Sequence, residues 1–111
     1  MTSRGPGFAV LYRWRLREGA EPAFIEAWSR VSDLLRSQRG SLGSRLHRGS
    51  DGLWYSYAQW PSAEVREKSQ RAGPVDPDAS RQMREATAEE FPDIVLDSVA
   101  DFMLLPVVPN A

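Results

Sequence analysis

A short aromatic segment at residues 54–60 ends directly before Pro61 and Ser62. Its side chains alternate, with Trp54 and Trp60 in the same set as two small residues, Ser56 and Ala58. A period of two is typical of a β-strand, and serine is a preferred residue at the start of a helix. The segment therefore predicts a strand that passes through a proline turn into a helix. A tryptophan at such a junction can form one wall of a pocket between a sheet and a helical layer.

The same two periodicities predict the other elements. Alternation predicts strands over residues 8–17, 41–48 and 94–105 beside the aromatic strand, which we place at 53–60. An apolar stripe at helical spacing predicts a helix over 21–39, begun near Pro22 and stopped by Gly40. Two further helices are expected, one from Ser62 to about residue 70 and one from Asp76 to about residue 90.

The resulting order is β-α-β-β-α-β, with the second helical region split in two. This order is that of an α+β, ferredoxin-like fold with a four-stranded antiparallel sheet and helices on one face. We expect a single domain over residues 7–105, a flexible tail at 1–6 and a C-terminal tail at 106–111.

The second face of the sheet bears on assembly. On the first strand it carries Leu11, Arg13 and Arg15, and on the third strand it carries Tyr55 and Tyr57. A face this apolar favours a homodimer in which two sheets meet, giving a dimeric α+β barrel. The alternative is a monomer whose polar sheet face is partly exposed to water.

The last strand is assigned to the two faces by its alternation. The residues expected to face the helices are Ile94, Leu96, Ala100, Phe102 and Leu104. The residues expected on the open face are Val95, Asp97, Val99, Asp101 and Met103. On this assignment, Asp97 or Asp101 would pair with an arginine of the first strand.

Composition excludes several classes of function. The formal net charge is -1, which leaves no broad basic surface for nucleic acid or an anionic membrane. The chain has no cysteine and a single histidine, His47, so no metal site and no thiol nucleophile is expected. No apolar run is long enough to span a membrane, and the first residues lack the apolar core of a signal peptide. A cytoplasmic protein is expected.

Three stretches together resemble a known family, the dimeric α+β-barrel proteins related to antibiotic biosynthesis monooxygenases. The matching features are the first strand followed by Gly19 and a helix with Phe24 and Trp28, then Gly40-Ser41-Leu42-Gly43-Ser44-Arg45-Leu46-His47, and finally Tyr57-Ala58-Gln59-Trp60-Pro61-Ser62. The resemblance covers residues 7–105. These motifs are typical of the superfamily and not of one reaction.

The resemblance implies where to look for a site. Some members oxidise anthrones, quinols or polycyclic phenols with dioxygen and neither metal nor flavin, and some relatives cleave haem. Their pocket lies between sheet and helices, against a tryptophan matched here by Trp60. An asparagine of the first strand often accompanies it, whereas this chain offers Tyr12 near that place. Haem cleavage implies a histidine on a helix, and His47 is predicted to lie on a strand.

Tyr12 and Trp60 are therefore the candidate catalytic residues, and no cofactor is expected. A tyrosine can bind a phenolic oxygen or stabilise an oxyanion, and a tryptophan offers a large apolar face with one N–H group. The candidate substrate-binding residues are Trp14, Trp28, Ser56, Ala58, Met83 and Arg84. Each has a structural alternative: Trp28 belongs to the core stripe, Arg84 fits a solvated helix face, and Trp28 or Met83 could fill the space above Ser56 and Ala58.

Two functions from different classes follow. One is cofactor-independent oxygenation of an aromatic or quinol-type small molecule. The other is non-catalytic binding of a small molecule by a stress-associated dimer of the same fold. His47 could act as a general base, although its arginine neighbours are typical of a solvated surface group.

Overall fold

The computed structural model describes residues 7–103. The predicted tails at 1–6 and 106–111, and the predicted strand residues Leu104 and Leu105, lie outside this range. Within it the elements are β1 (Phe8–Leu16), α1 (Glu21–Gln38), β2 (Gly43–Arg48), β3 (Trp54–Trp60), α2 (Ala63–Arg71), α3 (Pro77–Ala86) and β4 (Thr87–Asp97).

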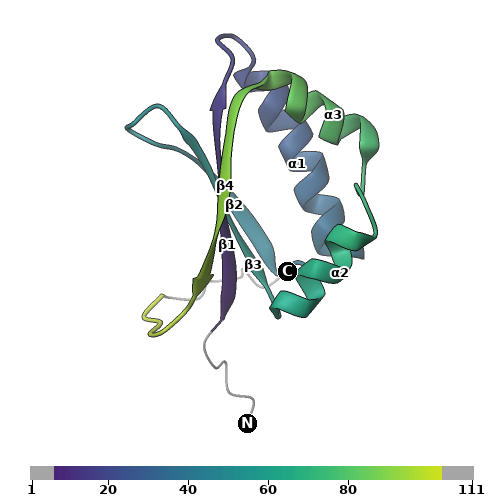
Figure 1. Cartoon of the computed structure of the whole chain (residues 1–111), viewed down its shortest axis with the longest axis vertical. Helices are drawn as coiled ribbons and strands as arrows, with labels where there is room; N and C mark the ends of the chain where they lie inside the picture. The colour runs from purple at the N-terminus through teal and green to yellow at the C-terminus, as the bar shows by residue number, and fades with distance from the viewer. Residues whose placement is uncertain (1–6, 104–111) are drawn as a thin grey trace, which may run out of the picture.

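The predicted fold is confirmed. The four strands form one antiparallel sheet in the order β2-β3-β1-β4, and the three helices lie on one side of it, as Figure 1 shows. The hairpin loop between β2 and β3 projects away from the helical layer (Figure 1). None of the helices in residues 7–103 is both long and apolar enough to cross a membrane.

The helix starts follow from local chemistry. The Ser62 hydroxyl accepts a hydrogen bond from the Val65 backbone N–H at 3.2 Å and caps α2. A carboxylate oxygen of Asp76 accepts from the Ala79 N–H at 3.0 Å and caps α3, where Pro77 occupies the first turn. This hydrogen bond, helped by the Arg30 guanidinium, holds the pKa of Asp76 below its usual value.

The core lies between the sheet and α1. Phe24 is fully buried, and its ring lies 5.0 Å from that of Trp14 and 6.5 Å from that of Trp54, centroid to centroid. Ala86 at the end of α3 completes the buried cluster. Aromatic rings in such tilted and edge-to-face contacts stabilise a core beyond the area that they bury.

The last strand differs from the prediction. It was expected at 94–105, after a helix that reached about residue 90, yet α3 ends at Ala86 and β4 spans Thr87–Asp97. Residues 98–103 form neither helix nor strand, and Phe102 is almost fully exposed. The prediction took Pro92 as a breaker, but an edge strand tolerates a proline because one side of its backbone needs no partner.

The faces of β4 also differ from the prediction, and a β-bulge precedes the residues concerned. In β1, Leu11 pairs with Ile94 and Arg13 pairs with Phe91. The one residue between them, Tyr12, therefore lies opposite two residues of β4, Pro92 and Asp93. Ile94 therefore shares the open face with Leu11 and not the helical face, and Leu96 likewise lies opposite Ala9. The one-residue shift changes the side to which every following side chain points.

The predicted charge pairing is corrected accordingly. Arg15 forms an ion pair with Glu89 at 3.3 Å, and Arg13 donates a hydrogen bond to the Pro92 carbonyl at 3.1 Å. Asp97 lies opposite Phe8 instead. Both arginine guanidinium groups also lie within 6 Å of the Phe91 ring centroid, at 5.6 and 5.9 Å. The open face thus carries apolar residues, with Arg13 and Arg15 over the ring of Phe91. The contribution of β1 agrees with the prediction, whereas β4 supplies Phe91 and Glu89 in place of the predicted aspartates.

Candidate functional site

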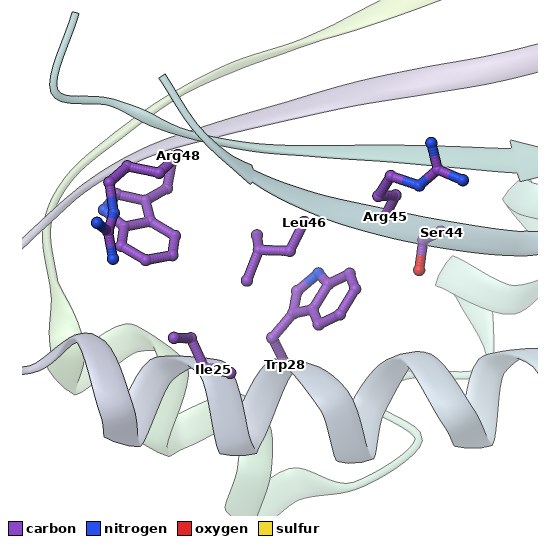
Figure 2. Close-up of a pocket in the computed structure, with 7 residues that line it drawn as sticks. Ile25, Trp28, Ser44, Arg45, Leu46 and Arg48 are labelled. Carbon is purple, nitrogen blue, oxygen red and sulfur yellow. The ribbon is translucent and has the colours of Figure 1, made fainter. Parts of the chain in front are cut away.

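Within residues 7–103, two of the hollows lie between the sheet and the helices. The larger, the edge cavity, has a volume of about 470 Å³ and opens beside the edge strand β2. Its lining residues are Ile25, Trp28, Ser44, Arg45, Leu46, Arg48 and Trp54. Figure 2 shows Ile25 and Trp28 rising from α1 towards Leu46 of β2. The guanidinium of Arg48 lies 5.0 Å from the ring of Trp54 and partly covers it.

The second hollow, the Tyr12–Trp60 cavity, has a volume of about 330 Å³. Tyr12 and Trp60 form its sheet side, and the remaining lining comes from α1, α2, the α2–α3 connection and α3. Those remaining residues are Val31, Leu35, Arg66, Ser69, Gln70, Gly73, Pro74, Val75 and Ser80. The lining is apolar with a few polar groups, which is the usual composition of a small-molecule site. The structure therefore brings the two predicted catalytic residues to one cavity.

Trp28 and Ser56 lie between the two cavities. The indole Nε1 of Trp28 donates a hydrogen bond to the Ser56 hydroxyl at 3.1 Å. Across the sheet, Ser56 pairs with Tyr12, which lines the Tyr12–Trp60 cavity, and with Leu46, which lines the edge cavity. The Trp28–Ser56 contact therefore lies between the two cavities. Trp28 thus occupies the space that the small side chain of Ser56 leaves, which is the structural alternative expected from the sequence. Ala58 is also buried.

An arginine that the sequence analysis missed lies over Tyr12. Arg66 of α2 donates from Nε to the Tyr12 hydroxyl at 3.3 Å, and its guanidinium carbon lies 5.6 Å from the Tyr12 ring centroid. Its Nη2 lies 2.7 Å from a carboxylate oxygen of Asp93, in the bulge of β4. The Arg66 side chain is only 12% exposed. Helical spacing from the Ser62 cap fixes its place in α2, but nothing local indicates that it meets β4.

Trp60 also carries a buried polar group. The residue is 3% exposed, and its indole Nε1 is buried with no acceptor among residues 7–103. A buried N–H without a partner costs about 1–3 kcal/mol, so native structures seldom leave one unpaired. The Trp60 side chain lines the cavity, while its N–H group is enclosed by protein atoms.

The other predicted residues fall in different surroundings. Trp14 and Met83 belong to the core cluster around Phe24, and the Trp14 ring stacks on Tyr12 at 6.2 Å with an interplanar angle of 13°. Arg84 is exposed on α3 and lines neither cavity. His47 is exposed and pairs in register with Tyr55, on the sheet face that points away from both cavities.

Comparison with known proteins gives the family. The family model for antibiotic biosynthesis monooxygenases matches residues 7–75, which is more than half of the chain. The matched segment includes Tyr12, Trp60 and Arg66 but not Asp93. A search of curated proteins finds no significant match.

Several solved structures share the fold at low sequence identity. SnoaB, a cofactor-independent oxygenase from Streptomyces nogalater, is 17% identical with a TM-score of 0.66, over 90% of this chain and 98% of that one. A Bordetella bronchiseptica protein provisionally given the same family name is 17% identical with a TM-score of 0.68, over 86% and 98%. Rv0793 from Mycobacterium tuberculosis is 19% identical with a TM-score of 0.62, over 96% and 100%.

Proposed function

The chain belongs to the antibiotic biosynthesis monooxygenase family, and we propose that it oxygenates an aromatic or quinol-type small molecule without a cofactor. The observation that carries the proposal is the Tyr12–Trp60 cavity. Two aromatic residues, three residues with hydroxyl groups and one arginine line a hollow of about 330 Å³, large enough for a small planar molecule. The description of SnoaB as a cofactor-independent oxygenase supports the same reaction class.

The chemistry needs a substrate that gives up a proton readily. Loss of that proton leaves a carbanion or phenolate, whose electrons reduce dioxygen as a new carbon–oxygen bond forms. The resulting peroxide anion regains a proton, and the hydroperoxide loses water to leave a carbonyl group. The substrate is oxidised, one oxygen atom enters the product and the other leaves as water.

The cavity favours substrates that ionise by themselves. Its described lining contains neither a carboxylate nor an imidazole, so no group there is suited to act as a strong general base. An electron-rich phenol, quinol or anthrone ionises to a small fraction near neutral pH, and that ionised fraction would react with dioxygen. In this proposal Trp60 holds the ring, Tyr12 contacts the substrate oxygen, and Trp14 supports the Tyr12 ring by stacking on it.

We also propose that the protein is a homodimer that buries the open sheet face. Leu11 and Ile94 lie side by side there, and Ile94 is among the exposed large apolar residues. An apolar sheet face of this kind is a common interface between identical subunits. Burying it in a dimer leaves the helix-side cavities accessible, because they lie on the other face.

Oxygen uptake tests the proposed reaction. The purified protein is assayed against anthrones, quinols and polyphenols without added metal or flavin, beside the variant W60F. We expect uptake above the rate of autoxidation in the wild type and a reduced rate in W60F. The matched control is W54F, which makes the same change on the same strand but outside this cavity and should retain the rate.

The other outcomes separate the competing functions. Binding of the aromatic compounds without uptake, lost in W60A while the variant stays folded, would favour a binding protein over an enzyme. Equal losses in W60F and W54F would assign Trp60 a role in packing alone.

A further inference from the structure

We infer that Arg66, anchored by Asp93, is a positioning residue that directs the Tyr12 hydroxyl proton into the Tyr12–Trp60 cavity. The inference rests on the proposed function only in taking this cavity as the ligand site. It assigns to Arg66 no contact with the substrate. The residue acts through Tyr12 and thereby sets a preference for ligands that carry an oxygen acceptor.

The argument begins with the hydrogen-bonding capacity of the two groups. A tyrosine hydroxyl has one proton to donate and lone pairs to accept with, whereas an arginine side chain can only donate. The 3.3 Å contact from Arg66 Nε therefore occupies a lone pair of Tyr12 and leaves its proton unused. Among residues 7–103 the Tyr12 hydroxyl donates no hydrogen bond, and the residue lines the cavity. The proton is available to a ligand there.

Asp93 fixes the arginine. One Asp93 carboxylate oxygen lies 2.7 Å from Arg66 Nη2, while Arg66 Nε donates to the Tyr12 hydroxyl. The planar guanidinium thus donates to both groups in one fixed geometry. The bulge at Pro92 and Asp93 lies opposite Tyr12, which brings the carboxylate within reach of α2.

Charge strengthens the effect. A guanidinium that donates to a hydroxyl oxygen draws electron density from it, and this makes the hydroxyl proton a better donor. The ion pair is shielded from water on the arginine side, with the Arg66 and Asp93 side chains 12% and 34% exposed. Screening by salt is weaker for such a pair than for one at the surface. A carbonyl or phenolate oxygen is the acceptor that this donor would select.

A pair of probes isolates the hydrogen bond from general packing. Naphthalene and 1,4-naphthoquinone have the same fused-ring skeleton, but only the quinone has oxygen acceptors, and the chain has no cysteine with which the quinone could react. Equilibrium dialysis gives a dissociation constant for each probe in each variant, and the readout is the ratio of the two. In Y12F we expect the preference for the quinone to fall by about fivefold or more.

Arg66 variants test the positioning role itself. We expect R66Q to reduce the preference nearly as much as Y12F, and R66K to retain most of it because a lysine still donates but cannot accept. The double variant Y12F/R66Q should show no loss beyond Y12F, since Arg66 acts through Tyr12. R36Q, which removes an exposed arginine of α1, is the matched control and should leave the ratio unchanged.

Three outcomes would overturn the inference. An equal weakening of both probes in R66Q would mean that Arg66 only maintains packing. A further loss in Y12F/R66Q would mean that Arg66 contacts the ligand directly. A wild type that prefers neither probe would show that no donor faces the cavity. If the protein takes up no oxygen but the ratios of dissociation constants change as predicted, the proposed reaction is rejected and the positioning role of Arg66 is kept. If it takes up oxygen but the ratios do not change as predicted, the reaction is kept and the positioning role is rejected.

Discussion

The indole N–H of Trp28 and the hydroxyl of Ser56 form a 3.1 Å hydrogen bond that joins α1 to the centre of the sheet. Trp28 is half-buried and Ser56 is 2% exposed, so the bond lies at the inner edge of the helical layer. It explains why a small polar residue stands between the tryptophans of β3. An alanine at this position would also leave room for the Trp28 ring, but it could not accept the hydrogen bond from its N–H group.

Replacing Ser56 with alanine should therefore destabilise the protein. S56A leaves the Trp28 N–H without its acceptor, and we expect the free energy of unfolding to fall by about 1–2 kcal/mol. Urea denaturation followed by circular dichroism measures it. W28F and W28F/S56A complete a double-mutant cycle, in which S56A should cost much less when Trp28 is already absent. An equal cost in both backgrounds would contradict the role of this hydrogen bond.

Phe24 should be the residue of α1 on which stability depends most. It is fully buried between Trp14 and Trp54, so F24A creates a cavity and should lower the free energy of unfolding by about 3–5 kcal/mol. I25A, one position along the helix at a residue 40% exposed, should cost about 1 kcal/mol or less. Denaturant titration of both variants checks the difference, and similar costs would show that the core is centred elsewhere.

The Asp76 cap should make stability depend on acidity. Its pKa is lowered in the folded protein, chiefly by the Ala79 N–H, so its contribution is complete well above the unfolded value of 3.8 and is lost as the pH falls through the folded value. We expect D76A to melt at a lower temperature than the wild type at pH 7, with the gap closing below about pH 3.8. D33A, which removes an exposed partner of Arg36, should show little effect at pH 7.

A charge on the open sheet face should prevent dimer formation. Ile94 is 39% exposed and lies beside Leu11, so I94K would place an ammonium group in the proposed interface. Light scattering coupled to size-exclusion chromatography should give a dimer for the wild type and a monomer for I94K. I25K changes an equally exposed residue on the helical side and should remain dimeric. A monomeric wild type would reject the proposed interface.

The alternation along β1 and β3 is the part of the fold that could be predicted residue by residue. Tyr12 pairs with Ser56 and Trp14 with Trp54, all on the face that carries the helices, as their period of two requires. Both strands lie inside the sheet. On β3 the helix-facing residues are buried and the others are not, whereas on β1 the separation is weaker because Ala9 of the open face is also buried. The Ser62 cap and the Gly40 stop were also readable, because they depend on local backbone chemistry.

The sequence could not place β4. It is an edge strand with mostly exposed residues, so its two faces differ little in hydrophobicity and its alternation carries little information. The bulge at Pro92 then shifts its register, and a shift of one residue exchanges the faces. The prediction assigned Ile94 and Leu96 to the helical face because they alternate with Ala100, Phe102 and Leu104, but β4 ends at Asp97 and the first two lie on the open face.

The sequence by itself determined the order of elements, the helix caps and the helix-facing side of β1 and β3, because each depends on periodicity or on neighbours in the chain. Only the tertiary structure decided that Arg66 of α2 lies between Tyr12 and Asp93. Those three residues are far apart in sequence, and their contact depends on the packing of α2 and on a bulge that no local pattern encodes. Some of the residues that line the Tyr12–Trp60 cavity could thus be predicted from the sequence. The position of the Arg66 guanidinium beside Tyr12 could not.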